Sequence, residues 1–168
     1  MIRSKLSLLE LVILSILGAL LFVVQVVLGF LPNIELVSVL VIVYTRVYGW
    51  KVFYPIYLFV ALEAMWYGIN TWVIQYAYVW AILALAVLPL RRHDSRALWV
   101  LVNTAYGFLF GAFCSITYLF IGGFSAMAAY WISGIPYDLL HTGGNFLTAL
   151  VLGKPLYRLL SRLKQTIC

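Results

Sequence analysis

The sequence predicts an all-α membrane protein, a compact bundle of six transmembrane helices with both termini in the cytoplasm. The 168 residues are 65% hydrophobic and 10% charged, with a mean hydropathy of +1.06, which is too apolar for a water-soluble domain of this length. A spanning helix needs about 20 apolar residues, so the chain has room for about six. All 11 Lys and Arg residues fall on one side of the membrane when six spans alternate in direction.

Turn-forming residues divide the apolar sequence into six runs. Asn33 follows the first run, Gly49 the second and Asn70 the third. Pro89 ends the fourth run before a basic cluster, and Gly122 follows the fifth. These residue types favour turns over continued helix. The predicted spans are residues 8–31, 34–48, 52–69, 72–90, 97–121 and 135–153, all within a single integral membrane domain of residues 1–168.

Two further segments are expected to lie at the membrane surface rather than across it. Residues 124–133 are apolar and aromatic but too short to span, so we expect them to lie at the interface or to fold over the outer face as a lid. Residues 155–164 place four leucines against Arg158, Arg162 and Lys164. This pattern predicts an amphipathic helix along the inner surface.

The basic residues orient the chain, because Lys and Arg are retained on the cytoplasmic side. With the amino terminus inside, the predicted outer turns near Asn33, Asn70 and 122–134 carry no basic residue. A reading with five or seven spans loses this asymmetry. The residues placed on the inner side are Arg3, Lys5, Arg46, Lys51, Arg91, Arg92, Arg96, Lys154, Arg158, Arg162 and Lys164.

The net charge, the cysteines and the first apolar run argue against a nucleic-acid-binding protein, a disulfide or metal site, and a cleavable signal. The net charge of +6 follows from membrane topology and is not taken as a nucleic-acid footprint. Cys114 lies within a predicted span and Cys168 at the inner end, so they are not expected to pair, and no metal or cofactor is expected. The first apolar run is too long for a cleavable signal and lacks a small-residue cleavage site.

Polar side chains within the outer halves of the spans are the candidate binding residues, because such groups are costly in lipid and usually face the protein interior. Asp138, His141 and Asn145 recur at helical spacing on one face of the sixth span. Structural alternatives are a helix-terminal carboxylate beside a core histidine, and an asparagine that joins two helices. The other candidates are Glu63, Tyr67, Asn70 and Asn33, together with Tyr76 and Trp80, which share one helical stripe of the fourth span with Trp72.

Carboxylates, an imidazole, amides and aromatic rings from three helices suit a small heteroaromatic ligand. No Lys or Arg lies in the outer half of the predicted bundle. A pocket that holds Glu63 and Asp138 without a cation is expected to repel carboxylate ligands and to favour neutral or positively charged ones. The aromatic residues have a structural alternative, since Trp and Tyr also collect at both membrane interfaces.

The first span carries small residues at the spacing that lets helices approach closely. Ser15 and Ala19 are four residues apart, with Gly18 beside them. Such a face suits contact with a partner helix, although internal packing would use the same pattern.

Three segments resemble the substrate-binding S component of energy-coupling factor (ECF) transporters. They are the Leu-Pro-Asn-Ile-Glu-Leu-Val-Ser stretch 31–38, the Tyr-Leu-Phe-Ile-Gly-Gly stretch 118–123, and the stretch 134–146 that holds Asp138 and His141. Size and predicted topology agree with that family, and the resemblance covers nearly the whole chain. The family usually has two alanines four apart in the first helix, and Ser15 replaces the first of them here.

The resemblance implies a subunit that captures a vitamin or vitamin precursor outside the cell. It implies as partners a transmembrane T subunit, contacted through Ser15, Gly18 and Ala19, and two cytoplasmic ATPases. The S component is thought to topple in the membrane to release its substrate. The chain has no GxxxxGK[ST] motif, so ATP hydrolysis is expected from the partners.

Two other classes of function were weighed. An autonomous secondary transporter would be expected to show inverted repeats and broken helices, and the sequence shows neither. An intramembrane enzyme would use Asp138 and His141 as an acid–base pair with Ser115 or Ser133 as nucleophile. No GxSxG or HExxH motif supports that reading, so the chain is not expected to be an enzyme.

Overall fold

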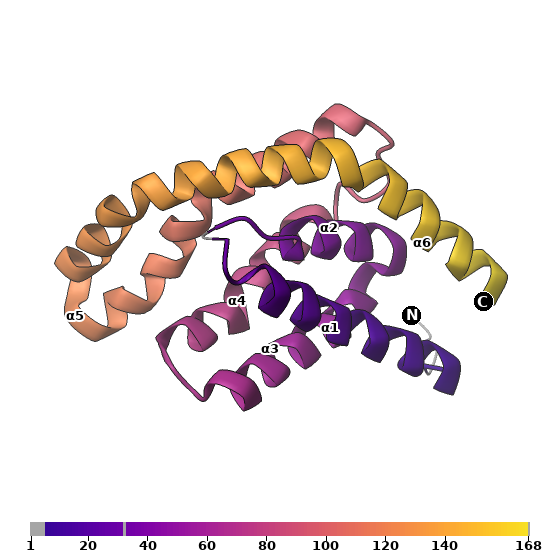
Figure 1. Ribbon diagram of the computed structural model, residues 1–168, viewed down its shortest axis with the longest axis horizontal. Helices are drawn as coiled ribbons and strands as arrows, with labels where there is room; N and C mark the ends of the chain where they lie inside the picture. The colour runs from indigo at the N-terminus through magenta and orange to yellow at the C-terminus, as the bar shows by residue number, and fades with distance from the viewer. Residues whose placement is uncertain (1–5, 32, 168) are drawn as a thin grey trace.

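A computed structural model describes residues 6–31 and 33–167, and every regular element in these residues is helical (Figure 1). The prediction of an all-α protein is therefore confirmed. Arg3, Lys5 and Cys168, which were assigned to the inner side, lie outside the described residues. The elements are α1 Leu8–Leu28, α2 Val37–Tyr48, the 3₁₀ turn η1 Gly49–Val52, α3 Phe53–Tyr67, α4 Thr71–Val87, α5 Arg96–Thr148, the π-helical turn η2 Ala149–Gly153 and α6 Lys154–Ile167.

α5 is a hairpin of two antiparallel arms, with its corner at Gly122 and Gly123. Gly122 has φ −141° and ψ 18°, and Gly123 has φ 73° and ψ −169°, so neither is helical. The positive φ at Gly123 is easily adopted only by glycine. Figure 1 shows the second arm returning beside the first and continuing through η2 into α6.

The corner overturns one sequence prediction. Residues 124–133 were expected to lie at the interface or to form a lid, but they are helical and belong to the second arm. The sixth apolar segment therefore begins just after Gly123, not at residue 135. Pro136 did not end the helix, and Gly134 ahead of it marks no break either.

Three helices begin where a side chain caps their free amides, as is common for Ser and Asn. The Ser7 hydroxyl accepts from the Glu10 amide, and Glu10 bonds back to the Ser7 amide, which starts α1. Asn70 caps α4 through Val73, and Ser95 caps α5. Asn70 thus has a structural role at the turn between α3 and α4.

α2 lies at the centre of the bundle. All of its residues from Val37 to Thr45 are buried, and it contacts α1, α4, α5 and α6. Its 12 residues rise roughly 18 Å, less than the roughly 30 Å of a bilayer core. The run predicted as a span at 34–48 thus contains a short helix at the core of the bundle, with longer helices around it.

The described basic residues of five segments meet at one end of the bundle. Lys51 pairs with Glu10 near the start of α1. Arg46 at the end of α2 reaches the α4–α5 loop, where its Nη2 donates to the His93 carbonyl at 3.1 Å. The Lys164 Nζ on α6 donates to the Val47 carbonyl at 2.8 Å. The start of α1 and the end of α6 lie at this same end in Figure 1.

In the described part of the chain, two helical segments are long and apolar enough to cross a membrane, Leu8–Leu28 and Arg96–Thr166. Only 22% and 17% of their most apolar windows are buried, whereas a core helix of a soluble protein would be mostly buried. Large apolar side chains such as Ile16, Phe120 and Val151 are exposed. This apolar exterior is compatible with lipid contact.

Candidate functional site

Two adjoining cavities lie at the end of the bundle opposite the basic residues. The first, the histidine cavity, has a volume of about 150 Å³ and is lined by Gln25, Glu35, Trp80 and His141 among others. The second, the aspartate cavity, has a volume of about 380 Å³ and is lined by Trp72, Gln75, Tyr130 and Asp138 among others. Both are lined by Asn33, Tyr76 and Phe110, so they form one site, called the outer site here because it lies at the end of the bundle away from the basic residues.

One wall of the outer site is a ladder of aromatic rings on α4. Trp72 and Tyr76 are 5.2 Å apart between ring centroids, and Tyr76 and Trp80 are 5.3 Å apart, both in edge-to-face geometry. Phe110 on the first arm of α5 packs 5.6 Å from Trp80. The predicted stripe of Trp72, Tyr76 and Trp80 is therefore present, and it lies at the site.

A buried pair of ionisable side chains forms the floor of the histidine cavity. The His141 Nε2 lies 3.1 Å from Glu35 Oε1. The other carboxylate oxygen of Glu35 accepts from the Ser38 amide at 2.8 Å, just inside the start of α2. Glu35 therefore joins the second arm of α5 to α2.

Asp138 was considered as a partner of His141, but its hydrogen bond goes to another group. The Gly111 amide donates to Asp138 Oδ1 at 2.9 Å, from the first arm of α5 to the second. Asp138 Oδ2 has no hydrogen-bond partner among the described residues. One carboxylate oxygen is thus anchored, and the other is a buried acceptor without a partner among the described residues, on a side chain that lines the aspartate cavity.

Glycines on the first arm set the depth of the site. A Cβ on Gly111 would overlap the Asp138 carboxylate, and a Cβ on Gly107 would lie 2.9 Å from the His141 carbonyl oxygen. The two arms reach this separation only because neither residue carries a side chain. Asp138 and His141 owe their position to these two glycines.

Asn145 lies deeper in the bundle and joins the two arms. Its Nδ2 donates to the Asn103 carbonyl at 3.2 Å, and the Asn103 Nδ2 donates to the Asn145 carbonyl at 2.8 Å. Asn145 does not line either cavity. The sequence left Asn145 as either a ligand contact or a residue that joins two helices, and these hydrogen bonds favour the second interpretation.

The three candidates on and after α3 lie away from the cavity linings. Glu63 is fully buried, and neither of its carboxylate oxygens has a hydrogen-bond partner among the described residues. Tyr67 is about half exposed and contacts the Trp72 ring edge-to-face. Asn70 caps α4. Asn33, Tyr76, Trp80, Asp138 and His141 are the predicted residues that the fold does bring to the outer site.

Sequence reasoning did not include several lining residues among the site residues. Glu35 was not among the predicted site residues, although a carboxylate two positions after Asn33, beside a predicted outer turn, was the available signal. Gln25 lies on α1, and its Nε2 donates to the Tyr76 hydroxyl at 3.1 Å. Phe110 and Gly111 carry no polar signal, so only the fold reveals them.

The small residues of α1 divide between two faces. Ser15 and Ala19 are exposed, and the Ser15 hydroxyl donates to the Leu11 carbonyl at 2.9 Å, so it needs no outside partner. Gly18 is buried against α3, where a Cβ would lie 2.9 Å from the Pro55 carbonyl oxygen. Gly18 therefore serves internal packing, and the exposed small surface consists of Ser15 and Ala19.

Comparisons with protein-family models, with curated proteins and with solved structures found no match for this chain. Within residues 6–31 and 33–167, no group of three His, Cys, Asp or Glu side chains is placed to hold a metal ion.

Proposed function

We propose that this protein is the substrate-capture S component of an ECF-type importer in the bacterial cell membrane, binding a small heteroaromatic vitamin or precursor at its outer face. One observation carries the proposal. Four residues that line the outer site each have a buried polar atom without a hydrogen-bond partner among the described residues, namely Gln25, Trp80, Asp138 and His141. Buried polar atoms are normally paired, so these four suit the polar edge of a ligand.

The aromatic ladder supports a flat, ring-shaped ligand. Trp72, Tyr76, Trp80 and Phe110 offer ring faces and edges to the joined cavities, and aromatic rings favour offset and edge-to-face partners. The aspartate cavity alone, at about 380 Å³, falls within the size range of small-molecule sites. A single heteroaromatic ring system with short substituents fits this volume.

The charges of the site favour a neutral or positively charged ligand. The described residues that line the two cavities include the carboxylates of Glu35 and Asp138 and no Lys or Arg. Glu35 is occupied by His141 and Ser38, which leaves Asp138 Oδ2 to meet a cationic or hydrogen-donating group. A ligand carboxylate would meet like charge without compensation.

The proposed membrane arrangement has six apolar helical arms: α1 to α4 and the two arms of α5. Basic residues at one end then define the cytoplasmic side, which places the outer site outside and both termini inside. Cysteine labelling in a background without Cys114 and Cys168 tests this. Ile69→Cys should react with an impermeant reagent in intact cells and Arg92→Cys only after permeabilisation; reaction of both from one side contradicts the arrangement.

Release would require partners, since the sequence has no nucleotide-binding motif of the GxxxxGK[ST] kind. The T subunit is proposed to pack on the exposed α1 face at Ser15 and Ala19, where small side chains permit close helix approach. Two cytoplasmic ATPases would supply the energy. An apolar exterior with few charges is compatible with reorientation of the subunit in lipid.

Mass spectrometry of the compound that copurifies with the protein is the direct test of the ligand class. Thiamine and pyridoxine, as cationic and neutral compounds, should quench tryptophan fluorescence more readily than biotin, folate or pantothenate. Binding of the acidic vitamins alone would contradict the charge argument. Asp138→Asn should weaken a cationic ligand more than a neutral one, because it removes charge with little change in volume.

The alternative is an autonomous secondary transporter. The observation that favours it is the buried carboxylate of Glu63, which has no hydrogen-bond partner among the described residues, since proton-coupled carriers use such groups at bilayer depth. Reconstitution into liposomes separates the two proposals. Uptake by the protein alone would support the carrier, and uptake only with a T subunit and ATPases would support the S component.

A further inference from the structure

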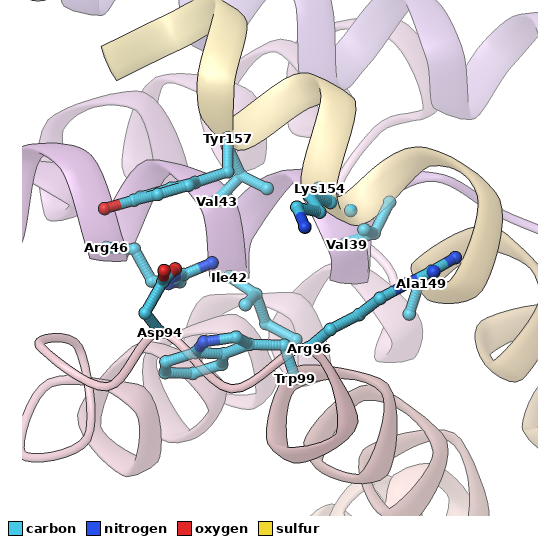
Figure 2. A pocket seen from close by; sticks show the side chains of 11 residues that line it. Val39, Ile42, Val43, Arg46, Asp94, Arg96, Trp99, Ala149, Lys154 and Tyr157 are labelled. Atoms are coloured by element: carbon cyan, nitrogen blue, oxygen red, sulfur yellow. The ribbon is translucent and has the colours of Figure 1, made fainter.

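A third cavity lies at the basic end of the bundle, far along α5 from the outer site. It has a volume of about 40 Å³ and is lined by α2, the first turns of α5, η2 and the start of α6. Its charged lining residues are Arg46, Asp94, Arg96 and Lys154. We call it the inner cavity; Figure 2 shows its lining side chains.

Arg46 is a buried cation with little compensation. Its guanidinium lies between two aromatic rings, 4.4 Å from the Trp99 centroid and 3.7 Å from the Tyr157 centroid (Figure 2). The Arg46 side chain is 5% exposed, whereas its ion-pair partner Asp94, 3.7 Å away, is 99% exposed. A solvated carboxylate contributes little to such a pair. Arg46 Nε has no hydrogen-bond partner among the described residues.

Two more cations and a helix end add to the positive potential at the inner cavity. Arg96 is the first residue of α5, where the free backbone amides carry partial positive charge. Its Nη2 donates to the Leu150 carbonyl at 2.6 Å, within the π-helical turn η2. Lys154, at the start of α6, also lines the cavity. The three cations face a single carboxylate, so an anion is favoured here.

An apolar groove begins where the inner cavity ends. It is lined by Arg96, Val100, Leu101, Thr104, Phe146 and Leu150, on the two arms of α5 and η2, with a volume of about 630 Å³. Arg96 lines both the groove and the inner cavity. A charged recess therefore opens beside a long apolar surface, which is the arrangement that a phospholipid headgroup and its acyl chain require.

We propose that the inner cavity and this groove bind one anionic phospholipid of the cytoplasmic leaflet. The phosphodiester would lie among Arg46, Arg96 and Lys154, with one acyl chain along Val100 and Phe146. A volume of about 40 Å³ holds about three water molecules, which suits a phosphate group but not a nucleotide. Basic recesses between helices on the cytoplasmic side are suited to acidic lipid headgroups. The inference rests on the membrane embedding in the proposed function, not on the captured substrate.

Native mass spectrometry of the intact protein in detergent tests the proposal, with phosphatidylglycerol and phosphatidylcholine added at equal concentration. One phosphatidylglycerol should be retained in preference to phosphatidylcholine. Arg96→Ala should reduce that retention about tenfold, the usual weight of a hydrogen bond to a charged group. Arg158→Ala is the matched control, because it removes an exposed cation from α6 that does not line the cavity.

Val100→Trp provides a second variant, since it obstructs the groove and leaves every cation in place. It too should reduce phosphatidylglycerol retention, while the variant elutes as the wild-type monomer on size exclusion. Equal retention of the two lipids by the wild type would overturn the proposal. So would an equal loss in Arg158→Ala, or full displacement of the lipid by millimolar inorganic phosphate. A protein that still binds its heteroaromatic ligand while failing these tests retains its proposed function and loses only the lipid site.

Discussion

His141 and Glu35 are 106 positions apart, yet His141 Nε2 lies 3.1 Å from Glu35 Oε1 in the buried interior of the bundle. This contact ties the loop after α1 to the second arm of α5. It also completes the outer site, since both residues line the histidine cavity. The candidate site and the start of α2 are therefore joined through one carboxylate.

Glu35→Ala should lower both the stability of the protein and its affinity for ligand. The variant leaves His141 and the Ser38 amide without their acceptor, at a cost of about 1–3 kcal/mol. Thermal unfolding in detergent, followed by circular dichroism, measures the first effect, and calorimetric titration with the copurified compound measures the second. Glu35→Gln should recover most of the stability, because its amide oxygen still accepts one hydrogen bond. Equal damage from both substitutions would argue against this hydrogen-bonding role.

Trp80→Phe should weaken ligand binding, with only the modest loss of stability expected when a buried ring is replaced by a smaller one. Trp80 is buried, and its Nε1 has no hydrogen-bond partner among the described residues. Removing an unpaired N–H costs the protein little, whereas losing a ligand hydrogen bond costs roughly tenfold in affinity. Calorimetric titration is the suitable measurement, since the substitution also changes fluorescence. Unchanged affinity would show that this N–H does not meet the ligand.

Gly111→Ala should impair the site through Asp138. The added Cβ would overlap the Asp138 carboxylate, so the carboxylate must move and its hydrogen bond from the Gly111 amide weakens. We expect a loss of roughly tenfold in affinity for a cationic ligand. Gly143→Ala is the control, because its Cβ would meet no atom within 4 Å. If the two substitutions reduced ligand affinity to a similar extent, the loss would be due to the change in helix propensity and not to the contact with Asp138.

Asn103 and Asn145 should contribute to stability and not to ligand affinity. Each side chain donates to the backbone carbonyl of the other residue. Interhelical hydrogen bonds in membrane proteins contribute on average about 0.6 kcal/mol, so each alanine substitution should lower the free energy of unfolding by about that amount. A double-mutant cycle of Asn103→Ala and Asn145→Ala, measured by denaturant unfolding, should reveal coupling between them. A large loss of ligand affinity in Asn145→Ala would show instead that this residue contributes to ligand binding.

Ser15→Trp and Ala19→Trp should each preserve ligand binding and abolish uptake. Both positions are exposed on α1, so a large side chain is tolerated by the fold but prevents close approach of a T-subunit helix. Uptake of the labelled compound with the T subunit and ATPases present gives the readout. Leu147→Trp, at another exposed apolar position, serves as the control. Uptake that survives both α1 substitutions would remove this face from the proposed interface.

The positions of the helices and the gathering of basic residues at one end of the bundle could be predicted from the sequence, because both depend on local composition. Apolar runs interrupted at Asn33, Asn70 and Gly122 predicted the helices to within a few residues at most ends. The stripe of Trp72, Tyr76 and Trp80 followed from helical periodicity alone. The sequence did not predict that residues 124–133 belong to the second arm, because a ten-residue apolar run is too short to show a clear period; only the structure shows this run as helix continuous with residues 134–148.

Which polar groups meet was decided only by the tertiary structure. The sequence by itself determined that Asp138, His141 and Asn145 share a helix face, but their partners lie 27, 106 and 42 positions away. The hairpin in α5 brings Gly111 against Asp138, and the loop after α1 brings Glu35 against His141. The spacing of residues in the sequence specifies which side chains share a face of one helix. A binding site depends instead on the distances between helices, and these distances are determined by the close packing of the whole bundle.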